Sequence, residues 1–264
     1  MSAIIQSNKI INGVNLNTPA LPTPPKYVDV YERPECLSVV CVWWGDLYGI
    51  DYVQKLYNSV KRNLSIPHQF YCITEHDHVP EGVQKIQTPN TSKGWWQKVN
   101  LFQPGLFPKE SRILYLDLDV VITDSIDQIA SSWGEFVMIE NFGPNKRHAA
   151  HNSSLLLWNP TDLTDHIFNA FDQSVTQELH GDQCWIWRVM NSYITNFRKD
   201  LVDSYKYAKR PDWKRSNVDR PYSPVMIFHG NPKPHECGDA WVKQYWVWFT
   251  SFLHKSTWLS LCFC

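Results

Sequence analysis

The chain has 264 residues, with 25 Lys and Arg against 26 Asp and Glu, so its formal net charge is −1. That length supplies ample material for a core in one large domain or two small ones. The charge balance gives no global attraction to nucleic acid or to an anionic membrane, and neither is an expected partner. With 43% apolar and 19% charged residues, the composition is that of a folded protein rather than a disordered one.

Seven scattered cysteines form neither a disulfide framework nor a zinc-ligand spacing, so we expect a reducing, cytoplasmic location. The sequence predicts no signal peptide and no membrane-spanning segment, because no run approaches about 18 apolar residues. The last residues, 257–264, do not match a prenylation box. These residues would form either a packed or frayed end of the chain or a lipidated anchor.

The predicted elements begin after a proline-rich N-terminal extension, residues 1–36. Strands are predicted over 37–43, 69–74, 83–87 and 112–117, and then over 135–140, 154–158 and 225–228. Helices are predicted over 51–64, with Asp51 as N-cap, and over 95–102, 163–171, 181–187 and 239–248. This alternation predicts an α/β sheet that is parallel in its first half.

Aromatic residues are unusually frequent, with 13 Trp, 12 Tyr and 12 Phe. Flat sugar or base rings would account for some of them and buried clusters for others. Six tryptophans lie on predicted strands and helices, so we assign most of them to the core: Trp43, Trp158, Trp185, Trp187, Trp246 and Trp248. Trp95 and Trp96 instead flank the segment of Lys98, which is a candidate binding residue. No glycine-rich dinucleotide or P-loop fingerprint and no nucleophile elbow is present.

Asp117 and Asp119 follow the most apolar predicted strand, at the edge where open α/β sheets bind ligands. In an extended chain, residues i and i+2 face the same side, so both carboxylates can reach one cation. Hard oxygen ligands favour Mg²⁺ or Mn²⁺. Roughly one Asp-x-Asp is expected by chance, so a solvated turn is the alternative. Two carboxylates beside an apolar strand lose favourable contact with water, and this costs free energy unless a cation pairs with them. This argument favours the metal site over the solvated turn.

Two basic segments are further candidates. In the loop 229–234, His229 can complete a metal shell, Gly230 allows close backbone approach, and Lys233 offers a charge to phosphate. The alternative is an ordinary loop that leaves a strand. Lys98 precedes the acidic pair by one helical segment and would either steady a diphosphate or be solvated.

Two more segments have competing interpretations. Asp182 and Gln183 would bond sugar hydroxyls or act beside the reacting carbon, or else Asp182 would cap a helix. The basic and aromatic segment 206–215 would bind a phosphate-bearing acceptor or RNA, or form a solvated loop.

Taken in chain order, these pieces resemble the GT-A-fold nucleotide-sugar glycosyltransferases. The resemblance rests on Tyr48, Lys98, Tyr-Leu-Asp-Leu-Asp-Val-Val-Ile (115–122), Asn-Ser-Ser (152–154), Asp-Gln (182–183) and His-Gly-Asn-Pro-Lys-Pro (229–234). The nearest group is the retaining, family 8-like group that includes glycogenin and bacterial lipopolysaccharide galactosyltransferases. Residues 204–206 are similar to a segment of an uncharacterised bacterial and viral branch.

The resemblance covers about residues 37–250 and implies a single domain with a Rossmann-like, mixed central sheet flanked by helices. Residues 37–128 would form the nucleotide-sugar-binding half and residues 129–250 the acceptor half, followed by a tail, 251–264. The implied reaction is metal-dependent transfer of a sugar, with retention, from a nucleotide-sugar donor, which we expect to be a UDP-sugar. The acceptor would be a glycan, a lipid-linked molecule or a protein. A nucleotide-sugar hydrolase or binding protein of the same fold is the alternative.

The resemblance also implies a role for each site residue. Mn²⁺ or Mg²⁺ on the donor diphosphate would be held by Asp117, Asp119 and His229. The diphosphate or donor sugar would contact Lys98, Gly230 and Lys233, and the base would lie against Tyr48. The transferred sugar and acceptor would be surrounded by Asn152, Ser153, Asp182 and Gln183. The catalytic set would be Asp182, Gln183 and Lys233.

Three features depart from the family pattern: Leu118 inside the acidic pair, Ser154 where the turn usually has glycine, and Pro-His-Glu (234–236) where much of the family has Pro-Trp. The first two leave the donor sugar open, and the third alters the loop expected to close on the nucleotide.

Overall fold

The computed structural model describes residues 10–11, 14–15, 34–35, 37–87, 93–143, 150–208 and 223–248. Most of the N-terminal extension and of the segment 206–215, and all of the tail 251–264, lie outside the described residues. β1 (Ile10–Ile11) and β2 (Val14–Asn15) pair as a small antiparallel ribbon. Within the described part, no helix has the length and apolar character needed to cross a membrane.

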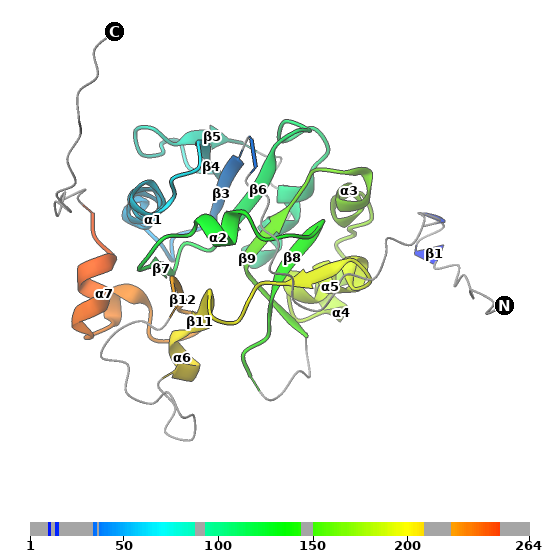
Figure 1. The fold of residues 1–264 in the computed structure, drawn as a ribbon. Helices are drawn as coiled ribbons and strands as arrows, with labels where there is room; N and C mark the ends of the chain where they lie inside the picture. Colours follow the sequence, from blue (N-terminus) through cyan, green and yellow to red (C-terminus); the bar gives the residue numbers. More distant parts are fainter. Residues whose placement is uncertain are drawn as a thin grey trace, which may run out of the picture.

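A seven-stranded mixed sheet forms the centre of the fold, in the order β10-β8-β9-β6-β3-β4-β5 (Figure 1). Its strands are β3 (Leu37–Trp43), β4 (His68–Thr74), β5 (Gln84–Ile86), β6 (Arg112–Leu116), β8 (Phe136–Glu140), β9 (His151–Trp158) and β10 (Ile194–Asn196). β3 to β6 run parallel, as predicted for the first half, whereas β9 runs antiparallel to β6 and β8. Strands from both predicted halves therefore share one sheet.

A three-stranded sheet beside it has the order β11-β12-β7, formed by β11 (Val202–Ser204), β12 (Val225–Ile227) and β7 (Val120–Ile122). β7, β10 and β11 were not predicted, although the equally short β5 and β12 were. A strand of three residues shows too little of a hydrophobic period to be recognised consistently. β7 begins directly after the acidic pair, so this small sheet positions the candidate site.

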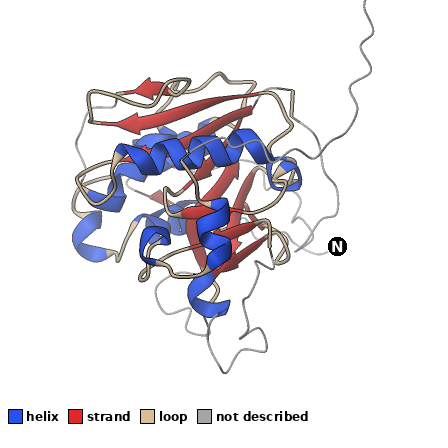
Figure 2. Cartoon of the chain, turned by 90° about the vertical axis from the view of Figure 1, so that its left-hand side faces the viewer, coloured by secondary structure: helices blue, strands red, loops and turns tan. Residues whose placement is uncertain are grey.

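Helices cover both faces of the central sheet (Figures 1 and 2). The larger elements are α1 (Ile50–Asn63), the 3₁₀ helix η1 (Gly94–Phe102), α3 (Asp162–Asn169), α5 (Asp182–Met190) and α7 (Ala240–Tyr245). The shorter ones are α2 (Asp127–Ala130), α4 (Val175–Glu178), α6 (Tyr205–Ala208) and η2 (Pro234–Glu236). One core packs α1 and α7 against the sheet, and a second core packs η1, α3 and α5 against its other face.

Two details of the helices correct the prediction. Gly49, not Asp51, is the N-cap of α1, and Asp51 lies in the first turn, where Lys55 Nζ is 3.0 Å from its carboxylate. The last described helix ends at Tyr245, short of the predicted 248. The described cysteines Cys41, Cys72, Cys184 and Cys237 are buried and form no disulfide, as expected.

Most of the six tryptophans assigned mainly to the core are buried, as predicted: Trp43, Trp158, Trp185 and Trp246. The other two, Trp187 and Trp248, are on the surface. Trp187 follows Trp185 by two residues, roughly 200° around the helix, so only one of the two rings can face the sheet. Trp248 lies beyond α7, without a helix to direct it inward.

Candidate active site

Three segments of the chain meet at the acidic pair because of strand register. β6 pairs antiparallel with β9, and the pairing continues past the strand end, where the Asp117 N–H donates to the Ser154 carbonyl at 2.9 Å. β7 pairs antiparallel with β12, with Val120 opposite Ile227. The chain that leaves β12 therefore passes Asp119. Segments predicted separately to carry chemistry thus converge on one strand end.

The carboxylate of Asp119 is enclosed by two donors. Lys233 Nζ donates to Asp119 Oδ2 at 2.6 Å, and the Tyr48 hydroxyl donates to the same oxygen at 3.0 Å. Asp119 is 5% exposed, and this burial, together with the charge of Asp117, raises its pKa although Lys233 opposes the shift. Burial and the charge of Asp119 raise the pKa of Tyr48, so its hydroxyl keeps its proton and remains a donor.

The carboxylate of Asp117 belongs to a second cluster around Lys98. Lys98 Nζ lies 2.8 Å from Asp117 Oδ1 and 3.6 Å from Asp182 Oδ2, and the Tyr115 hydroxyl also donates to Asp117. Burial alone would lower the pKa of Lys98, but the two carboxylates reverse this and raise it. Burial alone would raise the pKa of Asp117, but Lys98 brings it below its usual value. Lys98 is therefore charged and buried in ion pairs with two carboxylates, which excludes the alternative interpretation of a solvated lysine.

Asp182 points into this cluster instead of capping its helix. The N-cap of α5 is Gly181, and Asp182 is the first helical residue. The Ser153 hydroxyl donates to Asp182 Oδ2 at 2.6 Å. Burial raises the pKa of Asp182, an effect that Lys98 and Ser153 only partly offset. The capping alternative is therefore wrong.

His229 lies in an aromatic pocket beside the strand end. Its Nε2 is 2.7 Å from Ser204 Oγ, and its ring is parallel to that of Phe142, with 5.9 Å between centroids. Burial, followed by the charges of Lys206 and Lys233, lowers the pKa of His229 to about 4. The imidazole is therefore neutral near pH 7, the form in which histidine binds metal ions.

The predicted metal ligands Asp117, Asp119 and His229 are not gathered as one cluster. Among the described residues, no group of three or more His, Cys, Asp or Glu side chains has a metal-binding arrangement, and each of the two carboxylates contacts a lysine. The donor chemistry nevertheless fits Mn²⁺ or Mg²⁺, because it combines carboxylate oxygens with a neutral imidazole. Three carboxylates, two of them buried (Asp119 and Asp182) and one partly buried (Asp117), also face only two ammonium groups. A divalent cation would relieve this imbalance.

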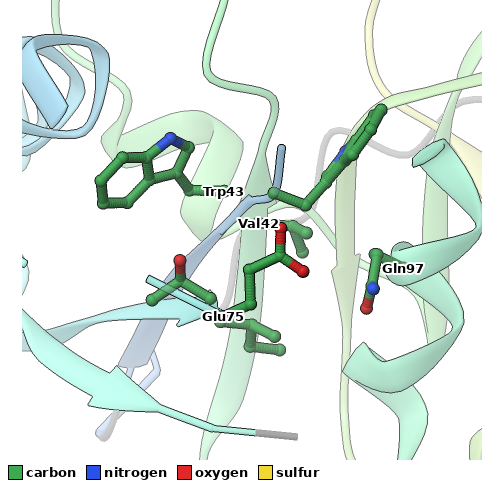
Figure 3. Close-up of a pocket in the computed structure, with 7 residues that line it drawn as sticks. Val42, Trp43, Glu75 and Gln97 are labelled. Atoms are coloured by element: carbon green, nitrogen blue, oxygen red, sulfur yellow. The ribbon is translucent and has the colours of Figure 1, made fainter. Parts of the chain in front are cut away.

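The loop that carries Tyr48 is fixed at the ends of β3 and β4. Trp43 Nε1 donates to the Tyr48 carbonyl at 2.7 Å, and the His76 ring stacks on Trp43 with 3.9 Å between centroids. The Gly45 N–H donates to Glu75 Oε1 at 2.9 Å. Figure 3 shows Trp43 and Glu75 together at these strand ends. This loop holds Tyr48 toward the acidic pair.

The loop that carries Lys233 is tied to α1. His235 Nδ1 and the Tyr52 hydroxyl form a hydrogen bond, and the Tyr52 ring lies against that of Tyr48, with 4.5 Å between centroids. The Lys233 N–H donates to Glu236 Oε2 at 2.8 Å. The departure noted at residues 234–236 therefore supplies two contacts that hold Lys233 in place.

The remaining predicted residues have local roles in the structure. Asn152 Oδ1 accepts from the Ser154 N–H at 2.8 Å, within its own strand. Gln183 is half-buried at the second position of α5. Gly230 has φ of 77°, a left-handed conformation that glycine adopts without strain.

The sequence reasoning missed four residues that support the site: Tyr52, Tyr115, Ser204 and His235. The contact of Tyr115 with Asp117 could have been predicted from the sequence, because residues two apart on a strand lie on the same face. The other three act through pairings that join segments distant in the sequence.

No family model and no curated protein sequence matches this chain. Solved structures do match. A galactosyltransferase LgtC, in complex with donor and acceptor sugar analogs, has a TM-score of 0.59 at 16% identity over 79% of this chain and 93% of its own. The glycosyltransferase GlyE of Streptococcus pneumoniae TIGR4 has a TM-score of 0.59 at 15% identity, over 79% of this chain and 59% of the GlyE chain. The bifunctional glycosyltransferase WbbM has a TM-score of 0.57 at 11% identity, over 78% of this chain and 48% of the WbbM chain. The chain therefore has the GT-A fold that these glycosyltransferases share.

Proposed function

We propose that this protein is a family 8-like glycosyltransferase that transfers a sugar from a UDP-sugar to a hydroxyl acceptor, with retention of configuration and with Mn²⁺ or Mg²⁺. The observation that carries the proposal is the convergence of Asp117, Asp119, Lys98 and Lys233 at the carboxyl end of β6, within a GT-A fold. Ligands of open α/β sheets bind at this edge.

The two lysines would hold the donor diphosphate. Breaking the sugar–phosphate bond places negative charge on the departing nucleoside diphosphate, and fixed cations stabilise that charge in a partly buried site. Lys233 would reach the diphosphate from its stiff loop, and Lys98 would approach from beneath the transferred sugar. Asp117, Asp119 and His229 would hold the divalent cation, which when bound would neutralise charge on the leaving group.

The acceptor would attack on the face from which the diphosphate leaves. The amide of Gln183 is a weak nucleophile, and Asp182 is held by Ser153 and lies near Lys98. A carboxylate engaged in this way is a poor candidate for a covalent intermediate. We therefore favour same-face attack assisted by the leaving phosphate, with Asp182 as the reserve nucleophile and Asn152 and Ser153 beside the sugar.

The test is the release of UDP from UDP-glucose and UDP-galactose, with and without Mn²⁺ and with a panel of acceptors. Asp117→Ala and Asp119→Ala should each lower turnover by at least about 100-fold, the loss typical of removing one electrostatic element of a catalytic site. Asp124→Ala, which removes an exposed carboxylate five residues beyond the pair, is the matched control. Full activity in both site variants would refute the proposal. UDP release without transfer to any acceptor would favour the hydrolase alternative.

A further inference from the structure

Trp95 is 54% exposed, although Trp96 beside it is 7% exposed and packs in the core. Single exposed apolar side chains are common on protein surfaces, so the position of Trp95 beside the site, and not its exposure alone, is the observation that matters. η1 is a 3₁₀ helix, in which residues i and i+3 lie one above the other. Trp95 therefore shares a helix face with Lys98, on the solvent side of the buried lysine.

Gly181 lies against one edge of the Trp95 ring. A Cβ at this position would lie 3.2 Å from Trp95 Nε1 and 3.4 Å from Trp95 Cδ1. The backbone of Gly181 is extended, with φ of 173° and ψ of 177°, which any residue adopts. Its glycine is thus explained by the close approach of Trp95 rather than by the backbone conformation. The next residue is Asp182, whose carboxylate lies within the site.

Gly94, just before Trp95, has φ of 68°, and a Cβ there would lie 3.6 Å from the Trp44 ring, in the loop that follows β3. Trp95 therefore lies near both this loop and the start of α5, with more than half of its side chain exposed. A flat apolar ring in this position can serve as a platform for a molecule that enters the site.

We propose that Trp95 is the stacking platform for a sugar ring of the acceptor, so that the acceptor of the proposed transfer is a glycan. One face of a pyranose presents C–H groups and no hydroxyls, and a tryptophan ring offers a flat apolar area that loses little conformational entropy on binding. The platform lies outside Lys98, one of the two lysines proposed to hold the donor, so an acceptor that enters from solvent would reach the ring.

This inference rests on the proposed function, and its test separates the two. The probes are the disaccharides lactose, maltose and cellobiose and, as hydroxyl acceptors without a sugar ring, glycerol, octanol and a serine peptide. UDP-glucose and UDP-galactose are the donors. The full chain should transfer to at least one disaccharide and to none of the other hydroxyls. Turnover of donor with transfer only to the latter, or to none of the probes, would overturn the inference and leave donor use intact. Absence of donor turnover would remove both.

Variants of Trp95 test the stacking role directly. Trp95→Ala should raise the KM for the disaccharide by at least about tenfold, the effect of truncating an aromatic at a binding hot spot, and the increase should fall on this KM rather than on the donor KM. Trp95→Phe should recover most of the loss, because it restores a flat ring. Trp133→Ala is the matched control, since Trp133 is also partly exposed but lines a cavity with Arg112, at the start of β6 and so at the opposite end of the sheet. An unchanged KM in Trp95→Ala would overturn the inference.

Discussion

Lys233 Nζ lies 2.6 Å from Asp119 Oδ2, although 114 residues separate the two in the sequence. The contact forms because β12 pairs with β7, which brings the loop after β12 to the residue that precedes β7. Lys233 has its side chain 16% exposed, and that of Asp119 is 8% exposed, so the pair is largely shielded from water. Under the proposed function, this ammonium group would exchange its carboxylate partner for a donor phosphate.

Lys233→Ala should lower kcat/KM for the nucleotide sugar by about 100-fold, because it removes a charge that stabilises the leaving group. Lys233→Arg should restore little of this loss, since the two side chains differ in length and geometry. Steady-state kinetics of UDP release checks both variants. Lys243→Ala, on α7, is the control, and a loss of similar size there would argue for a nonspecific charge effect.

Asp117→Asn and Asp182→Asn should change stability in opposite directions. The pKa of Asp117 is lowered in the fold, so its stabilising contribution is present above the unfolded pKa and is lost as pH falls through the folded value. Asp117→Asn should therefore lower the free energy of unfolding at pH 7.5 by about 2 kcal/mol, the scale of a lost charged hydrogen bond.

The pKa of Asp182 is raised, so ionised Asp182 opposes folding, and its contribution to stability is lost as pH rises through the folded value. Asp182→Asn should be at least as stable as the wild type at pH 7.5, and this advantage should shrink as pH falls through the folded pKa and be gone below the unfolded pKa. Urea unfolding in buffer with a chelator, at pH 7.5 and at acid pH, measures both variants. A pH-independent loss of stability in Asp182→Asn would contradict the expectation.

Tyr52→Phe should release the loop that carries Lys233, because it deletes the hydroxyl that bonds to His235 and keeps the ring. We expect the donor KM to rise about three- to tenfold, while stability falls by about 1 kcal/mol, as for one neutral hydrogen bond. Tyr57→Phe, on the same helix, is the control for a lost tyrosine hydroxyl. Equal kinetics in the two variants would show that the tie to α1 does not position Lys233.

Ser204→Ala should weaken metal activation without abolishing it. The Ser204 hydroxyl orients the imidazole of His229, and partners of this kind commonly change metal affinity by about 10- to 100-fold. Titration of Mn²⁺ into chelator-treated protein, with UDP release as the readout, should show a raised half-saturating concentration and a nearly normal plateau. An unchanged titration would remove Ser204 from the metal site.

The parts of the molecule that were predictable from sequence are those with local signals. β3, α1, β4 and β6 carry long apolar patterns, and Asp117 and Asp119 follow the most apolar strand. The contacts of Ser204 with His229 and of Tyr52 with His235 join segments 25 and 183 residues apart, and no local pattern encodes them. The exposure of Trp187 was not predictable, because the composition of α5 does not show which of its two tryptophans faces inward.

Binding of a nucleotide sugar at the acidic pair is tested most directly by a thermal-shift panel of UDP-, GDP- and ADP-sugars, with and without Mn²⁺. A ligand that binds only the folded protein raises its Tm with concentration. We expect a UDP-sugar to raise the Tm of the wild type in the presence of Mn²⁺, and to leave that of Asp119→Ala unchanged. No rise with any nucleotide sugar, or an equal rise in Asp119→Ala, would contradict a donor site at this edge of the sheet.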